Sequence, residues 1–457
     1  MPNNAFTLTE PGWHVQPSIA SVSGTLWVAW ATFEPTSCST HIHLGRCVHG
    51  IVVPEERVDT ETGFVLETAL MPDGTGGLWL AWVSAPTYAV TALRYRPDTG
   101  TMSPQTTLSA NSTRCRNVAP VVRPGVGTWL LWEAWNTQAR CQVAGSRLEH
   151  SESWSPVVPL TEPNRQAYWP TGTLRSDGRL WIATSSPNPD RTGYDCLLTC
   201  RDGAENDGPT FCLNRALCGS FHLHPHLAAG PDDTVWITWN VTTDQDYYAL
   251  AGRGGNSEFC YLQDPASRAR RSILWNVSVP MVRKLERDGP VLHIWQPEGT
   301  HPEDMRTAVG LLHHPRLIVS HDGRLCLLAQ RFDGKRRVFE TVITGPTPES
   351  WRAPASVTAG GPGAVHNGPV VACIQDHSGQ LAIVGESHRY PDMDERFRRP
   401  ESSSTLIATC IDAHALPDAV PQLQCVGVVG PWEPDGHPPR ASASGKKMYV
   451  GNLHIHT

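Results

Sequence analysis

The feature that most constrains the fold of this chain is a short phrase that recurs seven times. Each copy contains an apolar strand that usually begins at Pro, a turn with Gly or Asp-Gly, and a second strand. In the complete copies the second strand carries two Trp residues three positions apart. The copies span Pro17–Trp30, Glu67–Trp82, Pro120–Trp132, Pro170–Thr184, Pro225–Trp239, Pro315–Ala329 and Pro369–Gly385. Gly in the turns supplies the positive φ that a tight hairpin needs.

The spacing of the copies predicts a propeller. The position of the first Trp falls at residues 27, 79, 129, 181, 236, 326 and 382, so five of the six gaps lie between 50 and 56 residues. That length holds four short strands, which make one propeller blade. We therefore predict an all-β fold, a seven-bladed β-propeller of four-stranded antiparallel blades. The one longer gap leaves eight blades as the alternative, because Pro280–Trp295 could form the centre of a shortened blade.

The paired Trp residues require cover on both faces of each sheet. Residues three apart on a strand point to opposite faces, and blades that stack face to face cover both. At the N-terminus, Phe6–Pro11 has the sequence FTLTEP, which echoes PLTEP at Pro159–Pro163. We therefore expect residues 5–10 to form an outermost strand that completes the last blade and closes the ring.

Charge, hydropathy and cysteine content limit the classes of partner and the cellular location that we expect. The net charge is −7 and no basic run occurs, which argues against nucleic acid as a partner. No apolar run is long enough to span a membrane. The 13 Cys residues are an odd number and fall mostly on predicted strands. Because the N-terminus also lacks the features of a signal peptide, we expect a cytoplasmic protein, or an extracellular one if a leader is missing.

Three histidines in FHLHPH form the densest group of candidate metal ligands. His222, His224 and His226 alternate along an extended segment, and alternation places all three on one face. Three imidazoles could bind a divalent metal, Zn or Mn, with a position left open for water. The alternative is a run of histidines that face solvent at a junction between blades.

Histidine also recurs just before the Pro that begins several copies. His14, His222 and His366 each precede that Pro by three residues, while His313 and His314 directly precede Pro315. Equivalent positions in a ring converge on one end of its axis, which predicts a His-lined pocket for a ligand or for acid–base chemistry. The pocket would also include Asn117, Tyr168 and Arg389; catalytic candidates are His222, His224 and His366. The alternative is a repeat residue that only bonds to the backbone.

Other groups of polar residues have structural interpretations. The spacing of Cys196, Cys200, Cys212 and Cys218 differs from the close Cys pairs of zinc ribbons. His41 and His43 fit an ordinary strand, and Asp177, Asp232 and Asp322 fit hairpin turns.

The repeated phrase, with Trp-Val-Ala-Trp after the turn and Trp-Ser-x-Pro later, resembles the sialidase-like propeller superfamily with BNR-type repeats. The resemblance covers about residues 5–430 and implies a propeller that recognises a glycan. Sialidases carry an arginine triad that starts at Arg-Ile-Pro and complete Ser-x-Asp-x-Gly-x-Thr-Trp boxes. This sequence has neither, so the resemblance does not imply sialidase activity. Some polysaccharide lyases with such propellers use His beside Tyr or Arg.

A second resemblance lies at the C-terminus. Met448–Thr457 resembles the first strand of the polymerase and histidinol phosphatase (PHP) family of metallo-phosphoesterases. The resemblance implies that His454 and His456 are metal ligands, and Asn452 stands where the family has Asp. We accordingly divide the chain into a propeller, residues 1–440, and a linker with the truncated start of a PHP-like domain, residues 441–457. It implies a continuous or split PHP domain as partner.

Three functions are compatible with these features. The leading one is a module that recognises a glycan or another polar small molecule, as the N-terminal half of a protein with a PHP-type phosphoesterase domain. The first alternative is a glycan lyase or hydrolase that uses a His-lined channel mouth. The second is a scaffold that binds proteins. Fold alone does not separate them, because propellers support many chemistries.

Overall fold

The computed structural model describes the parts of the chain that build the ring. These are residues 5–7, 14–34, 36–37, 39–48, 51–60, 63–109, 113–138, 140–149, 152–163, 165–187, 194–201, 208–214, 221–242, 279–301, 304–305, 312–320, 323–332, 339–345, 355–356, 364–365, 371–374, 380–389, 404–412 and 421–432.

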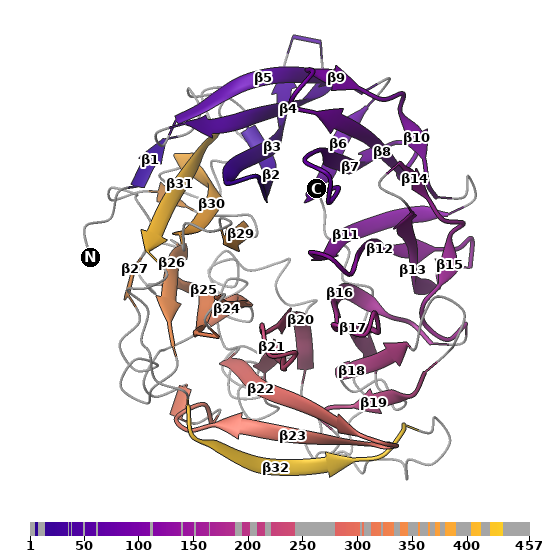
Figure 1. Cartoon of the computed structure of the whole chain (residues 1–457), viewed down its shortest axis with the longest axis vertical. Helices are drawn as coiled ribbons and strands as arrows, with labels where there is room; N and C mark the ends of the chain where they lie inside the picture. Colours follow the sequence, from indigo (N-terminus) through magenta and orange to yellow (C-terminus); the bar gives the residue numbers. More distant parts are fainter. Residues whose placement is uncertain are drawn as a thin grey trace, which may run out of the picture.

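The described residues form seven blades arranged in a ring, each blade an antiparallel sheet (Figure 1). Blade one contains β2 (His14–Val22), β3 (Thr25–Glu34), β4 (Ser39–Val48) and β5 (Ile51–Asp59). Blade two contains β6 (Phe64–Pro72), β7 (Leu78–Ala85), β8 (Ala89–Arg96), β9 (Thr101–Met102) and β10 (Thr106–Thr107). Blade three contains β11 (Arg114–Arg123), β12 (Gly127–Trp135), β13 (Cys141–Glu149), β14 (Ser153–Trp154) and β15 (Val158–Pro159).

The second half of the ring continues in the same order. Blade four contains β16 (Tyr168–Leu174), β17 (Leu180–Pro187), β18 (Tyr194–Arg201) and β19 (Thr210–Cys212). Blade five contains β20 (Phe221–Ala229), β21 (Val235–Thr242), β22 (Val279–Asp288), β23 (Val291–Pro297) and β32 (Leu423–Val429). Blade six contains β24 (Leu312–Val319), β25 (Leu325–Phe332), β26 (Phe339–Thr344) and β27 (Ala355–Ser356). Blade seven contains β1 (Ala5–Thr7), β28 (Ala364–Val365), β29 (Val371–Ile374), β30 (Gln380–Arg389) and β31 (Ser404–Asp412).

The seven-bladed prediction is confirmed, and the eight-bladed alternative is wrong. Pro280–Trp295 forms β22 and most of β23, which pair in sequence with β21 as the outer strands of blade five. The long gap between copies five and six therefore reflects an insertion between β21 and β22, residues 243–278, which lie outside the described residues. Among the described residues, a single strand pair, Tyr194 with Phe221, links the sheets of blades four and five, so they are separate blades although they count as one nine-stranded sheet.

The N-terminal strand closes the ring. Strand β1 pairs antiparallel with β31, with Phe6 opposite Ala408, and so becomes the outermost strand of blade seven. This confirms the expectation for residues 5–10 over the part described, residues 5–7. The last blade is thus built from both ends of the propeller sequence, which removes an open sheet edge.

A late strand extends blade five beyond the usual four. Strand β32 pairs antiparallel with β23, from Leu292 opposite Val429 to Pro297 opposite Leu423. Past its end, the backbone N–H of Trp432 donates to the carbonyl of Thr210 in blade four at 2.6 Å. The guanidinium of Arg165 lies 3.5 Å from the centre of the Trp432 ring system. The segment 421–432 therefore joins the outer parts of blades four and five.

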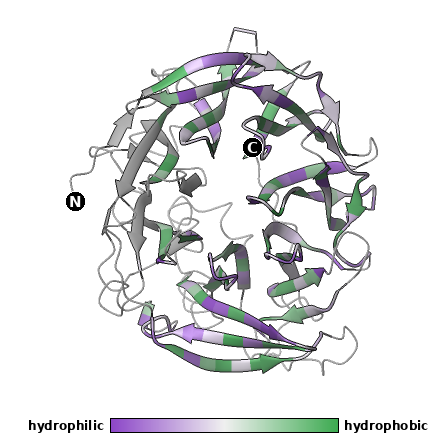
Figure 2. Cartoon of the chain, in the orientation of Figure 1, coloured by the Kyte–Doolittle hydropathy of each residue, from purple (hydrophilic) through white to green (hydrophobic). Residues whose placement is uncertain are grey.

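Apolar residues fill the spaces between blades. Figure 2 shows hydrophobic residues in each described blade instead of at one centre. The paired Trp residues face opposite neighbours, as predicted: Trp27 packs with blade two, while Trp30 packs with blade seven. All four complete pairs are at most 7% exposed. The ring is therefore held by many side-chain contacts between consecutive sheets.

The expectations about cysteines and membrane spans can be compared with the described residues only. The eight cysteines whose side chains the structure describes are free thiols, and six of them are buried. No helix among the described residues is both long and apolar enough to cross a bilayer.

Candidate ligand-binding site at the centre of the ring

One backbone feature recurs on the innermost strands of five blades. Within the first five residues of β2, β11, β16, β20 and β24, two residues face a single residue of the neighbouring strand. This is a β-bulge, which bends a strand and turns a side chain in a new direction. The first bulge residue has positive φ in each case. We call these five residues the bulge ring: Gln16, Asn117, Trp169, His224 and His314.

The repeated Pro explains why the bulge can occur inside a strand. In four of the five blades the second bulge residue is Pro, as at Pro17 and Pro225. Pro has no N–H to leave unpaired, and bulges are among the few strand positions that accept it. Blade three has Val118 instead, and its N–H donates to the carboxylate of Glu67 in blade two at 2.9 Å. In either case, the second bulge residue leaves no backbone N–H without an acceptor.

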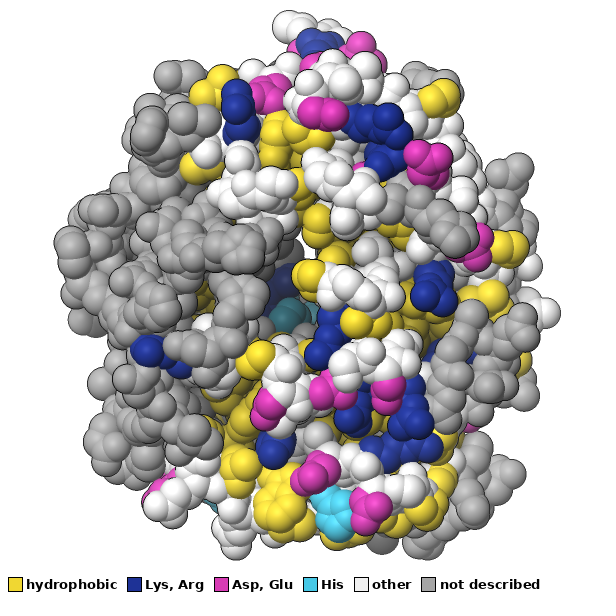
Figure 3. Space-filling view, in the orientation of Figure 1, with side chains coloured by type: hydrophobic (Ala, Val, Ile, Leu, Met, Phe, Trp, Pro, Cys, Tyr) yellow, Lys and Arg dark blue, Asp and Glu magenta, His cyan; other side chains and the backbone are white. Residues whose placement is uncertain are grey.

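Three neighbouring members of the bulge ring touch across three blades. The rings of Trp169 and His224 lie 4.4 Å apart between centroids. Those of His224 and His314 lie 4.7 Å apart in an edge-on arrangement. The strands that carry them surround the centre of the ring (Figure 1). Figure 3 shows an opening there, with His and basic side chains inside it. The bulges therefore bring an indole and two imidazole rings from three blades together near the centre of the ring.

Glu133 fixes two members of the bulge ring and one neighbour. Its carboxylate accepts from the Asn117 side chain at 2.7 Å, the Trp169 backbone N–H at 2.7 Å and the Trp135 indole N–H at 3.0 Å. The side chain is 3% exposed, and this burial raises the pKa of Glu133. A carboxylate with three donors is a positioning residue, because its oxygens are already occupied.

Four aromatic residues gather beside this carboxylate. Tyr168 lies between Trp135 and Tyr194, with ring centroids 5.4 Å and 6.1 Å away. Trp169 lies 5.8 Å from Tyr168 and 6.2 Å from Tyr194. The Tyr168 hydroxyl donates to the side-chain oxygen of Gln166. We call Trp135, Tyr168, Trp169 and Tyr194 the aromatic group. Three of the four are partly exposed, so the group presents aromatic faces to the surface as well as a contact between blades three and four.

The structure separates the three histidines that we expected on one face. The register shifts between Leu223 and His226, so alternation fails across His224. His222 is fully buried and accepts a hydrogen bond from the Trp239 indole at 2.8 Å. His226 accepts from the backbone N–H of Leu317 in blade six at 3.3 Å. Only His224 joins the bulge ring. The cause is the bulge, which the strict alternation argument did not include.

No group of three or more His, Cys, Asp or Glu side chains that could hold a metal ion occurs in the described part of the chain. Cys196, Cys200 and Cys212 are buried in the core of blade four, where burial raises the pKa of Cys196. Asp177 and Asp232 accept backbone N–H bonds in hairpin turns, as expected.

The remaining candidates fall into two sets. His14 lies on β2 ahead of the bulge, in a hydrogen bond of 3.0 Å with the Thr32 hydroxyl. His14 is therefore the counterpart of His222. The residue that joins the bulge ring is the one directly before Pro, and not the one three positions before it. Five candidate residues lie outside the residues or side chains that the structure describes: His313, His366, Arg389, His454 and His456.

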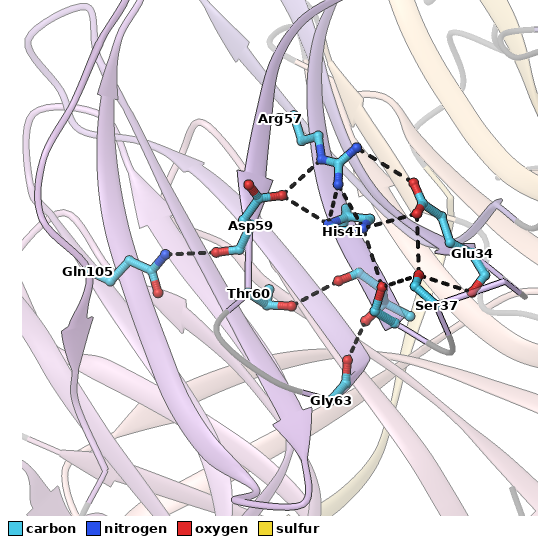
Figure 4. Close-up of polar contacts among 10 residues, drawn as sticks. Glu34, Ser37, His41, Arg57, Asp59, Thr60, Gly63 and Gln105 are labelled. Carbon is cyan, nitrogen blue, oxygen red and sulfur yellow. Dashed lines mark hydrogen bonds and ion pairs between the residues drawn. The ribbon is translucent and has the colours of Figure 1, made fainter.

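A second polar cluster lies on the outer strands of blade one. Figure 4 shows His41 and Arg57 between the carboxylates of Asp59 and Glu34. His41 Nδ1 lies 3.0 Å from Asp59, and Ser39 Oγ lies 3.4 Å from His41 Nε2. This order of hydroxyl, imidazole and carboxylate is the arrangement of a serine nucleophile.

Arg57 prevents that use of His41. Its Nη2 lies 2.8 Å from His41 Nε2, so the guanidinium donates to the nitrogen that would have to accept the hydroxyl proton. Arg57 also binds Asp59 at 2.9 Å, and this hydrogen bond lowers the pKa of Asp59. The cluster is thus a network in which Arg57 occupies both the imidazole and the carboxylate, and the central opening is the better candidate site.

Comparisons with known proteins give only distant likenesses. No protein-family model matches the chain, and no curated protein matches it in sequence. An alpha-L-arabinanase from Penicillium chrysogenum, solved with arabinobiose, is 13% identical and covers 91% of this chain and 100% of its own, with a TM-score of 0.42. A protein of unknown function from Dyadobacter fermentans is 11% identical over 90% of this chain and 99% of its own, with a TM-score of 0.46. A Hadza microbial sialidase is 10% identical over 89% of this chain and 66% of its own, with a TM-score of 0.44. The function has to be inferred from the chain's own residues.

Proposed function

We propose that this propeller is a glycan-recognition module that binds a sugar unit in the central opening, against the aromatic group and the adjoining bulge ring. The observation that carries the proposal is the contact between Trp169, His224 and His314, three side chains that separate blades turn toward the same place. Sugars present apolar C–H faces and a rim of hydroxyls, so a site for them combines aromatic faces with a few fixed hydrogen-bonding groups.

Both components of such a site are present. Trp135, Tyr168 and Trp169 supply partly exposed aromatic faces. Asn117 and Gln16 supply amides, and His224 and His314 supply imidazoles that can donate or accept. The carboxylate of Glu133 holds the Asn117 amide and the Trp169 backbone in place before any ligand binds. Such preorganisation lowers the entropy cost of binding.

The aromatic face can be removed at Trp169 without straining the backbone. Its φ is +50°, which glycine adopts freely, so Trp169→Gly removes the ring and keeps the bulge. We expect the affinity for the glycans that the wild type binds to fall by at least about tenfold, as titration calorimetry would measure after an array screen. Ser23→Gly is the matched control, because Ser23 also has positive φ, +51°, but lies in a hairpin turn. Unchanged affinity in Trp169→Gly, or no glycan binding by the wild type, would contradict the proposal.

Two finer expectations stay predictions. The PHP-like partner rests on Met448–Thr457, outside the described residues. A lyase or hydrolase would need a free acid or base in the opening. Glu133 is engaged by three donors, and burial lowers the pKa of His314 to about 4, so neither favours the enzyme over the binding module.

A further inference from the structure

Arg316 breaks a pattern that the neighbouring blades share. It is the first residue after the bulge of β24, the place that Thr171 occupies in blade four and His226 in blade five. Thr171 and His226 each accept a backbone N–H from the next blade, at 3.2 Å and 3.3 Å. A guanidinium has five donors and no acceptor. Arg316 therefore cannot make the contact between blades that this position makes in blades four and five.

The charge of Arg316 is the second way in which this position differs. No carboxylate forms an ion pair with it in the part of the chain that the structure describes, and burial lowers its pKa. Three other buried or partly buried arginines have such partners: Arg94 pairs with Asp73, Arg116 with Glu67, and Arg123 with Asp233. Arg283 forms no ion pair among the described residues, but it donates to the Val282 carbonyl at 2.7 Å. An enclosed charge without a partner is costly. Arg316 is partly exposed, so an anion from solution can reach it.

The groups around Arg316 leave it as a single positive charge. Burial, and then the charge of Arg316, lowers the pKa of His314 to about 4 and that of His226 to about 3. Both imidazoles are thus neutral near neutral pH. One guanidinium beside neutral hydrogen-bonding rings suits a monoanionic carboxylate, which its planar fork can bind through two parallel hydrogen bonds. A phosphate dianion would call for more positive charge.

We propose that Arg316 is the anion-binding residue of the central opening and that the ligand is a glycan containing a carboxylate-bearing sugar. The sugar ring would lie toward Trp169 and the carboxylate on Arg316, with His224 and His314 between them along the bulge ring. The inference rests on the proposed function and adds the substrate class. Figure 3 shows basic and His side chains together inside the opening.

Matched oligosaccharides test the substrate class. Titration calorimetry would compare uronate-containing oligosaccharides with the same oligosaccharides after reduction of the carboxyl groups. Arg316→Met keeps most of the side-chain volume and removes the charge. We expect it to weaken binding of the acidic ligand at least about tenfold and to leave the reduced ligand unaffected. The control is Arg283→Met: this arginine is 5% exposed and donates to the Val282 carbonyl, and its loss should change neither affinity. Equal weakening of both ligands, or of neither, in Arg316→Met would overturn the inference.

A second measurement does not depend on glycan binding. Because Arg316→Met removes an unbalanced enclosed charge, we expect the ligand-free variant to melt at the wild-type temperature or above it. Free glucuronate should raise the melting temperature of the wild type and of Arg283→Met, but not that of Arg316→Met. Inorganic phosphate and sulfate serve as comparison anions, and a stronger effect of either would overturn the assignment to a carboxylate.

The two proposals fail separately. If glucuronate stabilises the protein through Arg316 but no oligosaccharide binds, the anion site is supported and the proposed glycan function is wrong. If oligosaccharide binding depends on Trp169 but not on Arg316, the glycan function is supported and the anion site is wrong. If neither glucuronate nor any oligosaccharide acts on the wild type, both proposals are wrong.

Discussion

The imidazole of His226 joins blades five and six through a hydrogen bond that only its neutral form can accept. The Leu317 N–H donates to Nδ1 at 3.3 Å, so protonation of that nitrogen would break the contact. Burial lowers the pKa of His226 from 6.5 to about 3. The folded protein therefore takes up this proton only in strong acid.

This shift predicts how stability depends on pH. Between about pH 6.5 and 3 the unfolded chain holds a proton at this position that the folded chain does not. The free energy of unfolding therefore falls as the pH falls through that window, by up to ~1.4 kcal/mol per pH unit for one proton, and is fully retained above it. In His226→Asn the amide oxygen can still accept from Leu317, so we expect a shallower decline. Urea denaturation from about pH 7 to about pH 4 measures it.

The control for this prediction is His301→Asn, because His301 is exposed. Its decline should follow that of the wild type. Identical pH dependence in all three proteins would show that the hydrogen bond between blades does not report the protonation of His226.

The residues of the candidate site were only partly predictable. His224, His314, Asn117 and Tyr168 were expected from their positions near the repeated Pro, and the structure places them in the ring or beside it. Trp169, Glu133 and Arg316 were missed. Pro within a strand phrase was the available signal, because it indicates a bulge and shows which side chain is redirected. Nothing in the sequence ties Glu133 to Trp169, 36 residues later, since that contact exists only between packed blades.

Strand β32 and the residues after it connect two blades by a small number of contacts. The Trp432 ring system stacks under the Arg165 guanidinium, and the Trp432 N–H reaches Thr210. A cation–π pair of this kind contributes about 0.5–1 kcal/mol or more when it is shielded from water. The contact is therefore measurable by substitution.

A double-mutant cycle tests this connection. We expect Arg165→Met and Trp432→Leu each to lower the free energy of unfolding. We expect the double variant to lose less than the sum, by about 0.5–1 kcal/mol. Val428→Thr is the control in the same strand, because Val428 is 54% exposed, and it should change stability by less than about 0.5 kcal/mol. Additive losses would mean that Trp432 and Arg165 do not interact in solution.

Strands were predicted better than their irregularities. The repeated phrase predicted the two inner strands of each blade. The Trp pairs predicted that both faces of these strands are buried. The bulges were missed because a period of two was applied without interruption. Strand β32 was missed because it follows no repeat phrase: it adds to a blade whose other strands end more than a hundred residues earlier. Local patterns cannot encode such a pairing.

Closure by β1 makes the two ends of the ring depend on each other. Only three residue pairs join β1 to β31, yet they supply the outer strand of blade seven. We expect deletion of residues 1–7 to lower the unfolding temperature and to speed hydrogen exchange in β31. The amides of β12, on the other side of the ring, should keep their protection. A peptide of residues 1–10 added in trans should restore protection in β31.

Unchanged exchange in β31 after the deletion would contradict this role of β1. Equal acceleration in β12 would instead show that the ring opens as one unit.

The ring architecture was the most predictable feature, since the repeat period, the paired Trp residues and the echoed N-terminal segment each required it independently. The contents of the central opening were not, because they depend on how blades meet.

The pairing of β1 with β31 also sets an order for synthesis on the ribosome. At roughly 5–20 residues per second, about 20 to 80 seconds separate the emergence of the two strands. During that interval β1 is translated but has no partner, and blade one lacks its neighbour, blade seven. Blade five likewise receives β32 only after blade seven has been made. A nascent chain of this design gains most from chaperones that shield its first residues until translation is nearly finished.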